Sequence, residues 1–283
     1  MLARLAPFLF VLLWSTGFLG AKLGLPHAAP LVFLLVRYLL VITLMTSLAL
    51  AQRAPWPEDG RRWFHIGVSG LLLHGLYLGG VFVAIGAGLP AGITALIVGM
   101  QPLLTATVAG WLLREMIAPR QWLGLVLGFV GVVLVVSNKL GGTFGLDALW
   151  PVILALLGIT AGTLYQKRFC AHFDWRSGAV AQFLPTAIVT GIVVFTGNDL
   201  RIDWSGDFIF ALAWLVLALS IGAISLLNWL IRHGSAVNVA SLFYLTPPTT
   251  ALLAWLLFGE TLAGTALAGM ALAVWGVYLS RRT

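Results

Sequence analysis

Polar and aromatic side chains interrupt several of the chain's long apolar stretches, where they could bind a solute. His74 and Tyr77 lie three residues apart in one stretch, so they share a face if that stretch is helical. Thr160 and Thr163 have the same spacing in a later stretch. Polar groups inside a membrane usually face the interior of the helix bundle. A cavity of aromatic rings and hydroxyls suits a neutral or zwitterionic solute with an apolar body.

Proline residues near the middle of two apolar stretches indicate where the cavity should lie. Pro102 and Pro247 each remove a helical hydrogen bond and free the carbonyl four residues earlier. With Pro248 included, the carbonyls freed are those of Val98, Phe243 and Tyr244. In lipid a free carbonyl should face protein or a water-filled cavity, and matched breaks in two halves of a chain point to a transport site. The alternative is a packing kink with no role in binding.

Four more residues complete the expected cavity. They are Trp14, Gln101 directly before the first proline, and the neighbours Asn228 and Trp229. Other roles stay open for several candidates, because buried polar groups also link helices to one another. The threonines and Asn228 could make interhelical hydrogen bonds, His74 could be structural, and Trp14 could face lipid or pack.

Charged and catalytic residues are sparse in these stretches. No acid lies deep in one, and Glu115 and Glu260 stand at the expected helix ends, where capping is favoured over a proton relay. No Lys or Arg is expected in the centre, although Arg37 could reach inward, and a carrier of phosphates would need such cations. No G-x-S-x-G or G-x-x-x-x-G-K-[ST] motif occurs, which argues against a serine hydrolase and an ATPase. The single cysteine, Cys170, allows no intramolecular disulfide, and we expect no cofactor or metal.

The composition places these residues in a membrane. Of 283 residues, 60% are hydrophobic and 9% are charged, whereas a soluble domain carries about 25% charged residues. Such a chain has too little polar surface to cover a water-soluble globule. The net charge of +7 comes from scattered basic residues, so we attribute it to membrane topology and expect no nucleic-acid partner.

An all-α membrane protein with ten transmembrane helices follows from counting apolar stretches of about 20 residues. The predicted spans are 5–25, 31–51, 64–86, 91–113, 119–138, 149–169, 176–196, 208–232, 236–258 and 262–280. The connections are short, and no soluble domain fits between the spans. The first span could alternatively be a signal peptide. Basic residues gather on one side of this arrangement, which predicts cytoplasmic N- and C-termini in a bacterial inner membrane.

The chain also repeats itself. Shifted by 145 positions, the sequence aligns without gaps and matches a Pro, a Glu and two Gly in one register. The matched pairs are Pro102 with Pro247, Glu115 with Glu260, Gly124 with Gly269, and Gly131 with Gly276. Each unit, 1–145 and 146–283, then holds five helices. An odd number forces the second unit to insert upside down, as in many secondary transporters.

The paired Pro, Glu, Gly and Gly pattern, with Trp14 in the first span and Arg37 in the second, resembles the drug/metabolite transporter superfamily. Within it the chain is similar to the ten-helix EamA-type branch, and to the YddG-like amino-acid exporters. The resemblance implies an alternating-access exporter of small metabolites, with aromatic or other apolar amino acids as the expected substrates. Alternatives are export of other drugs or metabolites and, outside this class, a membrane channel or enzyme. The expected partners are the lipid bilayer and a small-molecule substrate, an amino acid or related metabolite.

Overall fold

A computed structural model describes residues 2–89, 91–137, 149–170, 172–197, 200–258 and 263–281. The first half comprises α1 (Leu2–Gly24), η1 (Leu25–His27), α2 (Pro30–Ala51), α3 (Gly60–Gly70), η2 (Leu71–Leu78), α4 (Gly79–Gly86), α5 (Ala91–Val98), α6 (Gln101–Leu112) and α7 (Pro119–Val136). The second half comprises α8 (Leu149–Phe169), α9 (Trp175–Thr196), α10 (Gly206–Trp214), η5 (Leu215–Ala223), α11 (Ile224–His233), α12 (Ala236–Ser241), η6 (Leu242–Leu245), α13 (Thr246–Phe258) and α14 (Gly264–Arg281).

Apolar helices dominate the described part of the chain. Seven of them, or continuous runs of them, are long and apolar enough to cross a membrane, and two further apolar helices are shorter. Within the described ranges the extended structure is an isolated bridge between Ala28 and Ile202. Large apolar side chains such as Phe8, Trp111 and Phe195 lie on the outside, where a bilayer would cover them. The expected class, an all-α membrane protein, is confirmed, and the number of crossings stays a prediction.

Two helical runs contain π-helical turns in their middle. These turns are η2, between α3 and α4, and η5, between α10 and α11. Shifted by 145 positions, residues 71–78 become 216–223, so the two turns occupy matching places in the two halves. Turns of this kind are rare and frequent at functional sites, because the extra residue per turn redirects side chains. The sequence analysis did not predict them.

Glycine pairs hold α7 and α14 in direct backbone contact. A methyl group placed on Gly269 would lie 2.6 Å from the carbonyl oxygen of Gly131, and one placed on Gly131 would lie 2.7 Å from that of Gly269. Gly124 and Gly276 are related in the same way, at 2.6 Å in each direction. The 145-residue repeat matches Gly124 with Gly269 and Gly131 with Gly276. The contacts cross over: Gly124 lies against Gly276, and Gly131 lies against Gly269. In lipid, close approach of this kind replaces the hydrophobic effect as the source of helix association.

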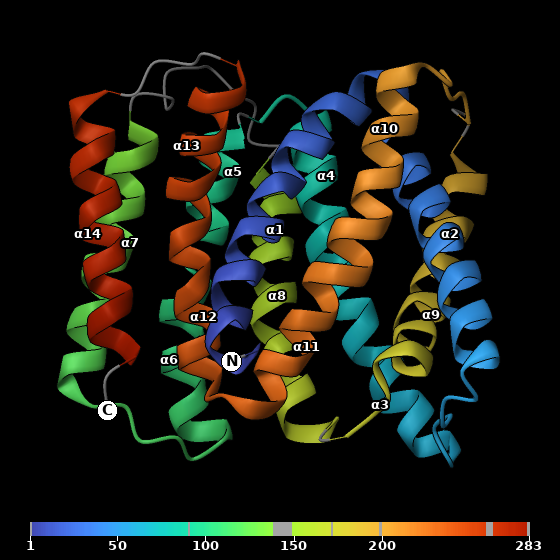
Figure 1. Ribbon diagram of the computed structural model, residues 1–283, viewed down its shortest axis with the longest axis horizontal. Coiled ribbons are helices and arrows are strands. Elements are labelled where there is room, and N and C mark those ends of the chain that lie inside the picture. Colours follow the sequence, from blue (N-terminus) through green and yellow to red (C-terminus); the bar gives the residue numbers. More distant parts are fainter. Residues whose placement is uncertain are drawn as a thin grey trace.

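The chain termini and one pair of matched segments can be placed relative to the two ends of the bundle. The start of α1 and the end of α14 lie at the same end of the bundle (Figure 1). α3 starts near this end too, whereas α10, at the matching place in the second half, starts at the opposite end (Figure 1). In Figure 1, α7 and α14 lie at one side of the bundle, and α2 and α9 lie at the other.

The thiol of Cys170, at the end of α8, should be almost inert towards maleimides in the folded protein. Its side chain is buried, and burial raises the pKa of Cys170 to about 11, whereas a free cysteine titrates near 8.5. Because the thiolate is the reacting form, labelling at pH 7.5 should be at least about 100-fold slower than in the unfolded chain. The rate should rise as the pH approaches 11. Time courses with and without denaturant measure this, and equal rates in both would contradict it.

Candidate functional site

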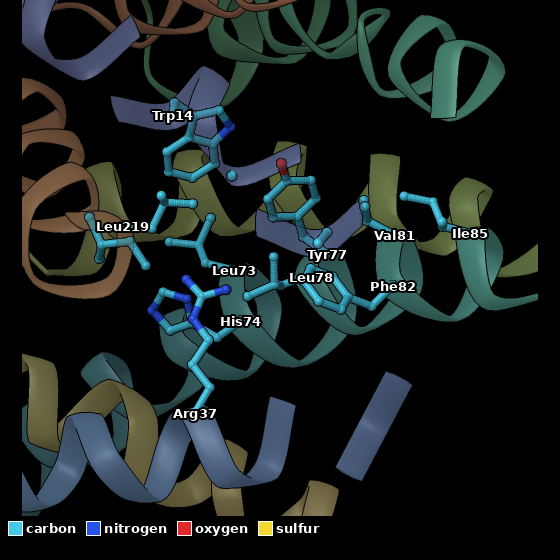
Figure 2. A pocket seen from close by; sticks show the side chains of 13 residues that line it. Trp14, Arg37, Leu73, His74, Tyr77, Leu78, Val81, Phe82, Ile85 and Leu219 are labelled. Carbon is cyan, nitrogen blue, oxygen red and sulfur yellow. The ribbon is translucent and has the colours of Figure 1, made fainter. Parts of the chain in front are cut away.

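A pocket opens among α1, α2, η2, α4 and the η5–α11 segment, and we call it the arginine pocket. Its lining residues come from both halves of the chain: Trp14, Gly17, Ala21, Arg37, Leu73, His74, Tyr77, Leu78, Val81, Phe82, Ile85, Leu219 and Ile224. Figure 2 shows Arg37 and His74 towards one end and Ile85 at the other. The pocket is therefore polar at one end, whereas apolar side chains of α4 line the other.

A second pocket, which we call the proline pocket, lies where two interrupted helices meet. Its lining residues are Trp14, Tyr77, Ala95, Val98, Gly99, Phe243, Thr246 and Pro247. In the first half, Gly99 and Met100 separate α5 from α6, and Pro102 stands at the start of α6. In the second half, the tighter 3-10 turn η6 precedes α13 and its two prolines. Both interruptions lie within one turn before the matched prolines, as expected from the lost hydrogen bonds.

Trp14 and Tyr77 line both pockets. Their rings stack with centroids 6.3 Å apart and planes 10° apart. Phe243 meets Trp14 edge to face at 5.2 Å, which joins the broken helix of the second half to this pair. Stacked and edge-to-face rings are the geometries that aromatic quadrupoles favour. The pair therefore forms the wall between the two pockets, and we call it the aromatic wall.

Arg37 is fully buried in the middle of α2. Its Nε donates a hydrogen bond of 2.9 Å to Oγ of Ser220, which belongs to η5 in the other half. Its Nη1 atom is buried and has no hydrogen-bond partner among the described residues. Of the described residues that line the arginine pocket, none is Asp or Glu. The sequence analysis expected no central Lys or Arg but allowed that Arg37 could reach inward. Arg37 does reach the end of the pocket, because its long side chain extends from mid-helix.

His74 stands at the same end of the pocket. Its ring stacks on Phe183 with centroids 4.1 Å apart, and its backbone carbonyl accepts a hydrogen bond of 2.7 Å from the Tyr38 hydroxyl. The stacking holds the ring in place, and the hydrogen bond holds the backbone of His74. Its Nε2 atom is buried and has no partner among the described residues. Two nitrogen atoms, one on Arg37 and one on His74, are thus available at the polar end of the pocket.

Asn228 lies outside both pockets, in a closed ring of amides that joins three helices. Gln182 donates to Oγ of Ser69 and to Oε1 of Gln166, both at 3.1 Å. Gln166 donates to Oδ1 of Asn228 at 2.9 Å, and Asn228 donates back to Oε1 of Gln182 at 3.2 Å. Each of these side chains is buried. Asn228 therefore makes the interhelical hydrogen bonds that were its alternative interpretation.

The remaining candidates also lie outside the lining of the two pockets. Gln101 donates to Thr105 at 3.0 Å, and Thr160 donates to the Leu156 carbonyl at 2.8 Å, both within their own helices. Trp229 stacks on His233. Pro102 is buried in α6, and the buried hydroxyls of Thr163 and Tyr244 have no partner among the described residues. The structure thus gathers Trp14, His74, Tyr77, Phe243 and Pro247 at the pockets, but not these residues or Asn228.

Two other features bear on chemistry. Oε1 of Glu115 accepts a hydrogen bond of 3.0 Å from the backbone N–H of Ala236, so it caps the start of α12, as expected. Glu260 lies outside the described residues. Among the described residues, no group of three or more His, Cys, Asp or Glu is placed to hold a metal ion. The pockets therefore offer binding surfaces, and within the described part of the chain they lack an evident catalytic constellation.

Comparisons with known proteins agree with this architecture. A crystal structure of another protein, 21% identical, superposes with a TM-score of 0.79 over 98% of this chain and 95% of its own, which shows a shared fold. The uncharacterized inner membrane transporter YedA of Escherichia coli K12 is 27% identical over 91% of this chain and 83% of its own. A probable amino-acid metabolite efflux pump of Salmonella typhimurium is 25% identical over 96% of this chain and 92% of its own.

The model of the EamA-like transporter family matches residues 1–137 and 148–282, which is almost the whole chain in two stretches. The family and these relatives indicate a transporter and not an enzyme. The expected superfamily is therefore confirmed, and this chain belongs to the EamA-like transporter family.

Proposed function

We propose that the chain is a secondary transporter of the inner membrane that exports small metabolites, with aromatic or other apolar amino acids as its main substrates. The observation that carries this proposal is the aromatic wall of Trp14 and Tyr77, because it lines both pockets between the two halves. Stacked rings bind flat apolar side chains well. The printed name of the Salmonella relative, an amino-acid metabolite efflux pump, supports the substrate class.

Alternating access between two inverted five-helix units, 1–145 and 146–283, is the proposed mechanism. Three observations support it: the matched π-helical turns, the reciprocal glycine contacts of α7 with α14, and the family match in two stretches. Two similar units of opposite orientation can exchange conformations, so that the site opens first to one side and then to the other. Ten crossings with both termini in the cytoplasm complete this proposal.

In this arrangement the arginine pocket faces away from the cytoplasm. Its lining follows η2 and α4 from His74 to Ile85, towards the end of the bundle opposite to the chain termini. On the cytoplasmic side, Gln182 of the second half donates a hydrogen bond of 3.1 Å to Ser69 of the first half, and Lys167 makes further bonds within the second half. The Lys167 ammonium donates to the carbonyls of Ile231 and Gly234 at 2.9 and 2.6 Å, which holds α8 against the end of α11. Of these bonds, the one from Gln182 to Ser69 joins the two halves, and it would have to break when the halves separate on this side.

Counterflow in proteoliposomes tests the proposed function. Vesicles with the purified protein, loaded with an unlabelled amino acid, should accumulate the labelled form transiently, and a panel should rank phenylalanine, tryptophan and leucine above polar amino acids. The flux should saturate with concentration, since each substrate must occupy the pocket. Flux without saturation or counterflow would indicate a channel instead, and accumulation of sugar phosphates alone would refute the substrate class.

A further inference from the structure

We propose that Arg37 and His74 form a carboxylate-binding subsite at the polar end of the arginine pocket, so that the chain selects apolar carboxylates. This inference rests on the proposed transport function and names the group on the substrate that is recognised. It starts from two buried nitrogen atoms, Nη1 of Arg37 and Nε2 of His74, which have no hydrogen-bond partner among the described residues. Both side chains are at least nine-tenths buried and line the same pocket.

The charge of Arg37 requires an anion at this place. A guanidinium stays protonated under all ordinary conditions, and burying it without a counter-charge is costly. Ser220 satisfies Nε, which fixes the plane of the guanidinium, but a hydroxyl supplies no charge. None of the described lining residues is acidic, and we infer that the substrate supplies this anion. A carboxylate fits, because it can accept from Nη1 of Arg37 and from Nε2 of a neutral His74.

The rest of the pocket indicates what the carboxylate is attached to. From the polar end, the lining passes the aromatic Tyr77 and continues along Val81, Phe82 and Ile85, which offer apolar contact. A ring or branched alkyl group would lie there. The same lining offers no acidic group to an ammonium, within the described residues. The carboxylate and the apolar body are therefore the recognised parts, and the amino group of an amino acid is dispensable.

Calorimetric titration of the purified protein with four probes tests this: L-phenylalanine, 3-phenylpropanoate, phenethylamine and phenylalanine methyl ester. We expect 3-phenylpropanoate to bind within about 10-fold of phenylalanine, and the two probes without a carboxylate to bind at least about 10-fold more weakly, the range for one charged hydrogen bond. The inference is overturned if the ester or the amine binds as tightly as the carboxylates, or if none of the four binds. The counterflow experiment with the amino-acid panel tests the proposed transport function independently of this inference.

Variants locate the subsite. Arg37→Gln should weaken both carboxylates by at least about 10-fold while leaving phenethylamine unchanged, since a buried charged bond is lost. Arg37→Lys keeps the charge but lacks the planar guanidinium with its fixed set of N–H donors. It replaces Arg37→Gln in this test if the glutamine variant does not fold. His74→Ala should weaken the carboxylates less than Arg37→Gln does. Arg61→Gln removes an equal charge from the exposed start of α3 and should change nothing. Unchanged carboxylate affinity in folded Arg37→Gln or Arg37→Lys would refute the assignment.

Discussion

Replacing Gly269 with leucine is expected to cost the protein most of its folded yield. At this position α14 touches α7 backbone to backbone, and even the first carbon of a side chain would lie 2.6 Å from the Gly131 carbonyl oxygen. The helices would have to separate, with loss of the neighbouring Gly124 and Gly276 contact. Overpacking by a few methylenes typically costs 1–3 kcal/mol, and here the obstacle is backbone, so we expect at least about 3 kcal/mol. Size-exclusion profiles and the melting temperature in detergent measure the effect.

The matched control is Gly264→Leu, on the same helix. A side chain added at Gly264 meets no atom within 4 Å. Because leucine favours helices more than glycine does, this variant should fold at least as well as the wild type. Equal yields and melting temperatures for the Gly269 and Gly264 variants would show that the α7–α14 contact contributes nothing to stability.

The second large effect concerns the aromatic wall. Tyr77→Ala should lower the ratio of maximal rate to half-saturation concentration in transport by at least about 10-fold, since it removes one face of the Trp14 stack and merges the two pockets. A stacked aromatic pair and its buried area together are worth more than about 1.4 kcal/mol, which is a factor of 10. Tyr77→Phe keeps the ring and should keep most of the activity. Initial rates of labelled phenylalanine uptake measure both variants.

Expression and melting temperature must accompany these rates, because Tyr77 is also buried. If folded Tyr77→Ala and His74→Ala proteins both transport at the wild-type rate, the segment from α3 to α4 does not line the substrate path. Loss of activity in Tyr77→Phe as well would assign the effect to the hydroxyl and not to the stacked ring.

Local patterns in the sequence predict much of the architecture. Apolar runs near 20 residues predict the all-helical membrane class, because the bilayer sets their length. The breaks near Pro102 and Pro247 are predictable for an equally local reason, since proline lacks the N–H that the helix needs. The repeat register also matches Gly124 with Gly269. It does not reveal that Gly124 contacts Gly276 instead.

The sequence analysis did not predict features that depend on how the helices are placed in space. The amide ring of Gln166, Gln182 and Asn228, with the Ser69 hydroxyl bound to it, joins residues from four separate helices. Nothing in their spacing indicates that they meet. The role of Arg37 had one usable signal, a lone charge in the middle of an apolar run. Whether such a side chain turns inward or reaches for the membrane surface depends on helix rotation, which follows from packing between helices and not from local sequence.

Opposite insertion of the two halves is the claim on which the transport mechanism depends, and two engineered cysteines test it directly. Gly60 and Gly206 begin α3 and α10, both are exposed, and neither has an atom within 4 Å of an added side-chain carbon. In a Cys170→Ala background, an impermeant maleimide applied to spheroplasts should label Gly206→Cys at once. Gly60→Cys should be labelled only after the membrane is permeabilised. Labelling of both positions from the same side would contradict the inverted arrangement.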